Sequence, residues 1–435
     1  MNRLIKNAMV YDAQNDKQGK YDILVNNEKI AAIEPLISDS GINNLEVIDA
    51  AGKVVIPALI DIHTHLREPG FEEKETIKTG AEAAAAGGYS AVAAMPNTSP
   101  VADNPAVIEQ LKLKAAKAAV RIYPIGSITQ TSQGEKLSEI GTLARAGAKA
   151  LSDDGNPVMN SEIMRRAMEY AAAFELPIID HCEDKNLSRD GVMHEGYYST
   201  IFGLQGIPAA AEEIMVARDI ILAEMTGVHL HLAHLSTAGS LNLVKEARAR
   251  GVKLSFEVTP HHLLLTDQAV KDYDPVMKVH PPLRSEKDRQ ELVNALKNGE
   301  IDILATDHAP HTYEDKLGEF DYAAFGISGL ETALALLYDN FIKTDLINWD
   351  DLLRMYYYNP AQVLAIEAEG LKVGARADFL IFNPEHNWTI DKNKFKSKGK
   401  NTPFNGWQLS GKNEMTFVAG KLVYDDREGR NEIIY

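Results

Sequence analysis

Histidine and aspartate residues that could bind a metal ion recur along the sequence, each after an apolar run. His63 and His65 follow the apolar run 54–60, and residues i and i+2 of an extended chain point to the same side. Imidazole is a preferred ligand for divalent metals such as zinc. A histidine pair on a strand is also typical of half-buried packing, so this pair alone does not predict a metal site.

The same residue types stand at the ends of further strand-like runs. Polar residues are common where strands meet solvent, but that explains poorly why imidazoles and carboxylates recur. The candidate ligands are His63, His65, Asp154 (or Asp153), His181, His234 and Asp307. One catalytic zinc ion takes three protein ligands and a water, so this set favours two ions with one bridging carboxylate. Two ions can lower the pKa of a shared water and polarise a carbonyl, while a nearby carboxylate moves the proton.

Strand-like and helical segments alternate through the middle of the chain and would position these ligands. We expect strands at residues 54–62, 90–95, 121–126, 148–152, 176–180, 228–233, 253–258 and 301–306. We expect helices at residues 80–86, 106–119, 139–146, 161–174, 209–224, 240–250 and 287–297. Strands separated by helices predict a parallel sheet, and eight such units predict an α/β fold of the (β/α)8 TIM-barrel type. The active site of such a barrel lies at the C-terminal ends of its strands.

Both ends of the chain carry short apolar runs separated by turn residues, as in small β modules. These runs lie at residues 4–5, 8–11, 22–25 and 29–33, and again at 377–382 and 415–424. Because chain termini commonly lie close together, we expect one discontinuous β-sandwich domain from residues 1–57 and 370–435, and a barrel domain from residues 58–369. Residues 184–208 form a long polar connection, a length typical of functional or mobile loops, and the basic run 392–400 is expected to be a solvated loop.

The chain of 435 residues is acidic, with a formal net charge of −17. A field of that sign disfavours nucleic acid and anionic membranes, and an anionic substrate would need local cations. Charged residues interrupt every apolar run before it reaches the length of a membrane span, and the N-terminus lacks the apolar core of a signal peptide. The single cysteine, Cys182, excludes an intrachain disulfide and favours a cytoplasmic location. We expect it to be a buried, inert thiol.

Six short motifs carry the candidate ligands and their neighbours. They are Asp-x-His-x-His-x-Arg at 61–67, Met-Pro-Asn-Thr at 95–98, Ser-Asp-Asp-Gly at 152–155, His-Cys-Glu-Asp at 181–184, Ala-His-Leu-Ser at 233–236 and Ala-Thr-Asp-His-Ala-Pro-His at 305–311. Together they resemble the amidohydrolase superfamily and, within it, the long bacterial class of dihydroorotases. The resemblance covers nearly the whole chain and includes the segments 203–208, 281–284, 325–331, 359–361 and 374–378.

The resemblance implies a role for each candidate. His63, His65 and Asp307 would hold one Zn2+ ion and His181 and His234 a second, with Asp154 as the bridge and Asp307 also as the general acid/base. The substrate would be bound by His65, Arg67, Asn97, His311 and the backbone of Phe325 and Gly326. Guanidinium clamps a carboxylate with two hydrogen bonds, so Arg67 would supply the cation that an anionic substrate needs. Where the resemblance leads us to expect an asparagine, this chain has His280, which can still donate a hydrogen bond to substrate.

The implied reaction is the reversible cyclisation of N-carbamoyl-L-aspartate to L-dihydroorotate with release of water, a step of pyrimidine biosynthesis. A homodimer is the implied assembly, and aspartate transcarbamoylase is the implied protein partner.

Two other functions remain open at this point. A hydantoinase, dihydropyrimidinase or allantoinase typically bridges its metals with a carbamylated lysine, and Lys149 lies about 16 Å upstream of Asp154 along an extended strand. An inactive paralogue that scaffolds a transcarbamoylase should have lost ligands, whereas all six are present here. Among the remaining histidines, His229 and His231 alternate with apolar residues in a parity opposite to that of His234, so we expect them to pack against the outer helices.

Overall fold

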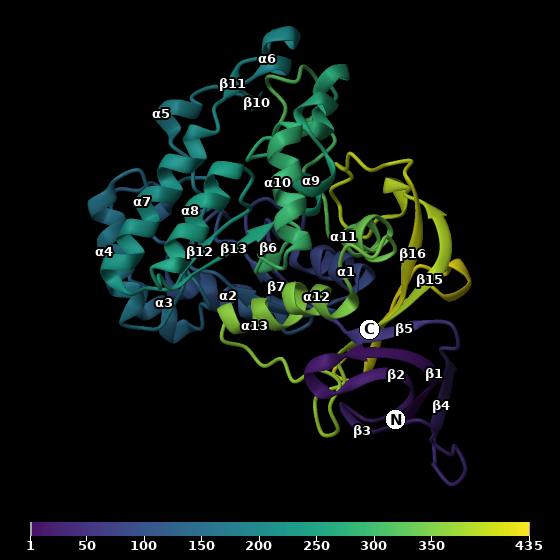
Figure 1. The fold of residues 1–435 in the computed structure, drawn as a ribbon. Helices are drawn as coiled ribbons and strands as arrows, with labels where there is room; N and C mark the ends of the chain where they lie inside the picture. The colour runs from purple at the N-terminus through teal and green to yellow at the C-terminus, as the bar shows by residue number, and fades with distance from the viewer. Residues whose placement is uncertain (1, 435) are drawn as a thin grey trace.

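The computed structural model describes residues 2–434, in which a barrel adjoins a sheet built from both ends of the chain (Figure 1). The barrel strands are β6 (Leu59–Thr64), β7 (Tyr89–Ala94), β8 (Arg121–Pro124), β9 (Ile178–Asp180), β12 (Leu230–Leu232), β13 (Leu254–Val258) and β14 (Ile303–Leu304). They pair in parallel as two sheets, β6-β7-β8 and β14-β13-β12-β9. Bridges of Leu151 with Gly126 and Ile178 join the two sheets, and a bridge between Thr64 and His308 closes the ring.

Two of the predicted strands differ from the observed ones. The strand expected at 148–152 is reduced to the bridges at Leu151. The strand expected at 54–62 is two strands, because β5 (Val54–Pro57) pairs with β15 (Phe379–Thr389) outside the barrel and only β6 enters it. Every residue from 54 to 64 is buried, so no change in the burial pattern marks the boundary. Pro57 lies at it and has no N–H with which to continue the ladder.

The helices that alternate with the strands were predicted to within a few residues. They are α1 (Ile77–Gly87), α2 (Pro105–Ala115), α3 (Ile140–Ala146), α4 (Ser161–Ala172), α7 (Ala210–Thr226), α8 (Ala238–Ala249) and α10 (Glu286–Lys297). Asn104, Asn160, Thr237 and Ser285 begin four of them by accepting hydrogen bonds from backbone N–H groups of the first turn. Shorter helices follow strands β13 and β14: α9 (Pro260–Leu264), α11 (Ala333–Leu337), α12 (Trp349–Leu353) and α13 (Asn359–Val363).

The terminal sheet has nine strands. The N-terminal ones are β1 (Asn2–Asp12), β2 (Lys17–Asn26), β3 (Lys29–Glu34), β4 (Leu45–Asp49) and β5; the C-terminal ones are β15, β16 (Gln408–Val418), β17 (Lys421–Asp425) and β18 (Glu432–Ile433). Strand β5 joins the two groups because it pairs with β1 on one side and β15 on the other. The core of this sheet includes Ile23, Val55 and the stacked rings of Phe379 and Phe417, whose centroids are 4.5 Å apart.

The long connection at 184–208 is folded. It contains α5 (Lys185–Ser188), β10 (Met193–His194), α6 (Tyr197–Phe202) and β11 (Gly206–Ile207), and β10 pairs with β11. Val192 and Met193 pack against Val270 and Phe320 from later loops, so this connection rises above the strand ends as a packed unit (Figure 1). Among residues 2–434, no helix combines the length and the apolar character that crossing a bilayer would require.

Candidate metal centre

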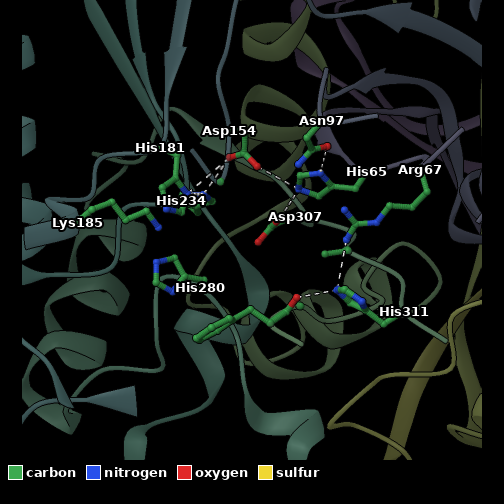
Figure 2. Close-up of a pocket in the computed structure, with 14 residues that line it drawn as sticks. His65, Arg67, Asn97, Asp154, His181, Lys185, His234, His280, Asp307 and His311 are labelled. Carbon is green, nitrogen blue, oxygen red and sulfur yellow. Dashed lines mark hydrogen bonds and ion pairs between the residues drawn. The ribbon is translucent and has the colours of Figure 1, made fainter. Parts of the chain in front are cut away.

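A pocket of about 250 Å³ lies at the C-terminal ends of the barrel strands (Figure 2). Its lining includes the following predicted site residues: His65, Arg67, Asn97, Asp154, His181, His234, His280, Asp307, His311, Phe325 and Gly326. His63 lies fully buried beneath the pocket and contacts Asp154. The structure therefore brings together all the residues that the sequence predicted for the site.

Asp154 is surrounded by four imidazoles. Its Oδ1 atom lies 3.4 Å from His63 Nε2, 3.6 Å from His181 Nδ1 and 3.5 Å from His234 Nε2. Its Oδ2 atom lies 3.4 Å from His65 Nε2. These contacts divide into two possible ligand groups that share Asp154, one with His63 and His65 and the other with His181 and His234.

The separations within this cluster suit metal ligands. Two ligands of a tetrahedral zinc ion with bonds of about 2.0 Å lie roughly 3.3 Å apart. Asp154 Oδ1 and His63 Nε2 are buried, and within residues 2–434 neither has a hydrogen-bond partner. A buried polar atom without a partner is costly, and a metal ion between them would satisfy both.

The charge state of Asp154 also fits. Burial raises the pKa of its carboxyl group, but the charge of His63 and the close imidazoles of His181 and His234 outweigh burial and hold that pKa well below its usual value. Asp154 is therefore a carboxylate, the form that binds metal.

Asp307 lies beside the same cluster, at the end of the last strand. Its Oδ1 atom is 3.1 Å from His65 Nε2 and 3.5 Å from His63 Nε2. Burial opposes its ionisation, yet the hydrogen bond from His65 and the charge of His63 lower the pKa of the carboxyl to about 2. Asp307, His234 and Arg67 all have positive φ angles, of 47°, 33° and 62°. Such conformations cost energy for residues other than glycine and occur both in turns and at active sites, and here three of them lie together around one pocket.

Asp153 serves a different purpose from Asp154. It accepts hydrogen bonds from the backbone N–H groups of Ile128 and Thr129 at 2.8 and 3.1 Å, and from the Ser127 hydroxyl at 2.7 Å. These contacts hold the loop that follows β8. Of the two aspartates that the sequence offered, only Asp154 faces the histidines.

Arg67 forms a cationic wall on one side of the pocket. Its Nε atom donates to the Pro310 carbonyl at 3.3 Å, and one terminal nitrogen lies 3.4 Å from His311 Nε2. Within residues 2–434 no carboxylate lies close enough to Arg67 to form a salt bridge. Figure 2 shows Arg67 and His311 on the opposite side of the pocket from His181, Lys185 and His280. A half-buried guanidinium that has no carboxylate partner within residues 2–434 and faces the candidate metal ligands is suited to a carboxylate of a bound molecule.

His280 belongs to the wall opposite Arg67. Its Nε2 atom lies 2.8 Å from Glu183 Oε2, its ring stacks on His181 at 5.2 Å, and Phe325 meets it edge-on at 4.8 Å. Burial lowers the pKa of His280 to about 4, so this residue is a neutral imidazole. The nitrogen that could donate a hydrogen bond to substrate is therefore directed to Glu183.

Sequence reasoning missed Glu257, which lies within β13 among buried residues. Its Oε1 atom is 2.5 Å from His63 Nδ1, so it orients one of the candidate ligands. A carboxylate between the apolar residues Phe256 and Val258 was the available signal. Asp61, also missed, accepts hydrogen bonds from the Thr306 hydroxyl at 2.5 Å and from the backbone N–H of His63 at 3.1 Å, and thereby joins the first and last strands.

The expectation for His229 and His231 was wrong. His231 is fully buried and contacts Glu257 and Ser255 inside the barrel. Strand β12 ends at Leu232 and the backbone of His234 turns through a positive φ, so strand alternation cannot be extended to His234. Cys182 is buried as expected, and burial raises the pKa of its thiol well above the usual value. Lys149 lies over the Tyr123 ring at 6.0 Å and does not line the pocket.

Comparison with known proteins shows similarity to dihydroorotases, in agreement with the motifs in the sequence. A family model described as dihydro-orotase-like matches residues 52–240. Dihydroorotase from Pelotomaculum thermopropionicum is 52% identical over 427 residues, covering 98% of this chain and 99% of that protein. Dihydroorotase from Thermoanaerobacter sp. is 50% identical over 426 residues, covering 98% and 97%.

Among solved structures, L-hydantoinase from Arthrobacter aurescens matches with a TM-score of 0.88 at 25% identity, covering 100% of this chain and 97% of that one. Dihydropyrimidinase from Brevibacillus agri matches with a TM-score of 0.85 at 23% identity, covering 100% and 97%. The solved structures share the barrel with its terminal β domain, whereas the full-length sequence identity is with dihydroorotases. The chain folds as a barrel with a candidate metal site and is 52% identical to a dihydroorotase over 98% of its length. It therefore belongs to the dihydroorotase family of the amidohydrolase superfamily.

Proposed function

We propose that the protein catalyses the reversible conversion of L-dihydroorotate and water to N-carbamoyl-L-aspartate, with two zinc ions bridged by Asp154. The observation that carries the proposal is the pairing of two features in one pocket. Four imidazoles converge on Asp154, and the half-buried cation Arg67 lines the same pocket. The first feature suits hydrolysis of an amide and the second suits a substrate that carries a carboxylate.

When bound, the zinc pair would activate a water molecule and polarise the ring carbonyl. Arg67, Asn97 and His311 would bind the substrate carboxylate and fix the ring, while the backbone of Phe325 and Gly326 contacts its other edge. As the water oxygen bonds to the amide carbon, an oxygen of Asp307 would accept the proton. Asp307 would then donate that proton to the ring nitrogen as the carbon–nitrogen bond breaks. Cyclisation follows the same steps in reverse.

The hydantoinase-like alternative has less support from this pocket. Its substrates have no carboxylate to pair with Arg67, and the lysine that would become carbamylated, Lys149, lies over Tyr123 and outside the pocket. The scaffold alternative predicts lost ligands, whereas all six candidates are present.

The experiment that tests the proposed function is a comparison of substrates on purified protein with measured metal content. We expect about two metal ions per chain and ring opening of dihydroorotate that is much faster than that of dihydrouracil or hydantoin. Faster turnover of either neutral substrate would contradict the proposal. Full activity with a single ion would remove the bridging arrangement.

We also propose that residues 58–369 form the catalytic domain and residues 1–57 with 370–435 the β-sandwich domain. The barrel strands lie between Leu59 and Leu304, and the terminal sheet uses only strands before residue 58 and after residue 378, which supports this division. Homodimer formation, association with aspartate transcarbamoylase and a cytoplasmic location belong to the same proposal. Light scattering of the purified protein, alone and mixed with the transcarbamoylase, tests the first two.

A further inference from the structure

A line of hydrogen-bonded side chains runs through the barrel interior, away from the metal centre. It begins at His63, whose Nδ1 atom is 2.5 Å from Glu257 Oε1. The other carboxylate oxygen of Glu257 is 3.1 Å from His231 Nε2. Ser255 Oγ then lies 2.8 Å from His231 Nδ1 and 3.0 Å from His229 Nε2. At its far end, His229 borders a cavity of about 730 Å³ at the opposite end of the strands from the metal centre.

The pairing of two neighbouring strands creates this line. In the parallel register of β12 and β13, His231 pairs with Ser255. His229 lies two residues before His231, and Glu257 two residues after Ser255, so all four side chains point to the same face of the sheet. His231 and Glu257 are fully buried. Burial in the barrel is costly for polar groups, so each of them depends on the hydrogen bonds made by the next.

The chemistry of Glu257 determines where the protons lie. A carboxylate only accepts hydrogen bonds, so His63 carries its hydrogen on Nδ1 and His231 carries one on Nε2. A neutral His231 then presents Nδ1 as an acceptor to the Ser255 hydroxyl, whose oxygen accepts from His229 Nε2. Every hydrogen bond in the line therefore points toward Glu257. In the metal-loaded protein, His63 would keep its hydrogen on Nδ1 and offer the lone pair of Nε2 on Asp154's side of the pocket, where the ion would bind.

We propose that Glu257, His231, Ser255 and His229 act as a positioning chain that fixes the tautomer and ring orientation of His63 and thereby sets the metal affinity of the site. The inference rests on the proposed function, in which His63 is a metal ligand. Residues that hydrogen-bond a metal-binding histidine typically change metal affinity by about 10- to 100-fold when mutated. In the positioning chain, this effect on metal affinity would extend beyond Glu257 to His231, Ser255 and His229, at the far end of the barrel.

The decisive variants change Ser255, in the middle of the positioning chain, which touches no candidate ligand. Ser255→Ala removes the link between His231 and His229, whereas Ser255→Thr keeps the hydroxyl on a strand-compatible residue. Ser90→Ala is the matched control, because Ser90 is also buried in a barrel strand and donates only to the carbonyls of Ala58 and Leu59 at 3.1 and 3.4 Å.

The readouts are the zinc dissociation constant of the apo-protein, measured by competition with a chromophoric chelator, and the visible absorption spectrum of the cobalt-substituted protein. We expect Ser255→Ala to weaken zinc binding by about tenfold and to alter the cobalt spectrum. Ser255→Thr should restore both to wild-type values. Ser90→Ala should leave both unchanged, even where its melting temperature falls.

The proposal is overturned if Ser255→Ala and Ser90→Ala have the same zinc affinity and the same cobalt spectrum. If Ser255→Ala does not fold, His229→Asn replaces it, at the half-buried end of this line of side chains. Weaker zinc binding than in the wild type is then expected, and wild-type affinity is the contradicting result. Absence of metal binding by the wild-type protein would instead contradict the proposed function, so the two failures are distinguishable.

Discussion

Asp307 is positioned as a proton carrier that stays ionised in a buried site. Its carboxyl group lies against His63 and His65, which keep its pKa at about 2, and its φ of 47° directs the side chain from the end of the last strand into the pocket. An ionised carboxylate can accept a proton from water and release it to a leaving nitrogen in the same turnover.

We predict that Asp307→Asn lowers the turnover of dihydroorotate by a factor of about a hundred or more. The amide keeps the shape of the side chain but cannot accept the proton. Steady-state kinetics combined with metal analysis is the measurement, since the loss must occur with metals bound. Near-normal turnover in a metal-loaded variant would remove Asp307 from the mechanism.

Arg67 is predicted to select substrates by their charge. Arg67→Met should reduce kcat/KM for dihydroorotate by about a hundredfold or more, because sites built to hydrogen-bond a substrate group lose most when the pairing is broken. The slow reaction with dihydrouracil, which lacks the carboxylate, should change little. Arg67→Lys serves as the control, because it keeps the charge and loses the two-pronged geometry. Its kcat/KM for dihydroorotate should lie between those of the wild type and Arg67→Met. An equal loss on both substrates would mean that Arg67 is structural.

At the residue scale, the sequence predicted those site residues that lie at the C-terminal end of a strand or just beyond it. His63, His181 and Asp307 each follow a recognisable apolar run, and the barrel brings such positions together. Glu257 and His231 could not be assigned in the same way, because they lie inside the predicted strands 253–258 and 228–233 and do not follow them. There, the same pattern fits both packing and function, and only the pairing of β12 with β13 distinguishes them.

At the element scale, the segment between β15 and β16 supports residues that line the pocket from outside the barrel. Asn401 donates to the carbonyls of Ala309 and Gly326, both at 3.0 Å, and accepts from the backbone N–H of His311 at 2.9 Å. Ile390 and Phe404 of the same segment pack into a hydrophobic cluster with barrel loops. The basic run 392–400 is therefore part of a packed segment and not the solvated loop that we expected. Its many lysine residues had suggested full exposure to solvent.

We predict that Asn401→Ala raises KM for dihydroorotate by about tenfold and lowers stability by about 1–3 kcal/mol, because three backbone groups lose a buried partner. Metal content should stay unchanged. Asn393→Ala, in the same segment but exposed and bonded to Asp391, is the matched control and should resemble the wild type. Kinetics and thermal denaturation measure the two effects. A folded Asn401→Ala variant with wild-type KM would show that this segment does not support the substrate site.

Element boundaries show where sequence patterns stop being informative. Helices α4 and α10 were predicted well because side-chain caps and a polar outer face mark their ends. The split between β5 and β6 was missed because both are entirely buried. Assigning β5 to the terminal sheet depends on β15, which lies more than 300 residues away along the chain.

At the scale of the whole molecule, the candidate ligands come from strand ends that are far apart in the sequence. His63 lies near the C-terminal end of the first barrel strand and Asp307 follows the last, and the ring is closed between them by the bridge from Thr64 to His308. The unfolded chain cannot hold these groups together, so metal ions should bind the folded protein selectively. Binding of this kind stabilises the fold by about 4 kcal/mol when the free ligand is a thousandfold above its dissociation constant.

We therefore predict that removing the metals lowers the melting temperature, and that zinc alone restores both the melting temperature and activity. Asp154 supplies a ready carboxylate between the histidines, so no bicarbonate should be needed, as it would be to carbamylate a lysine. Asp154→Ala should bind fewer metal ions and show a smaller rise in melting temperature with zinc. Lys149→Ala, the control, should behave as the wild type, because Lys149 lies over the Tyr123 ring. Calorimetry and activity assays with and without bicarbonate are the measurements. A requirement for bicarbonate, together with loss of activity in Lys149→Ala, would contradict a bridge formed by Asp154.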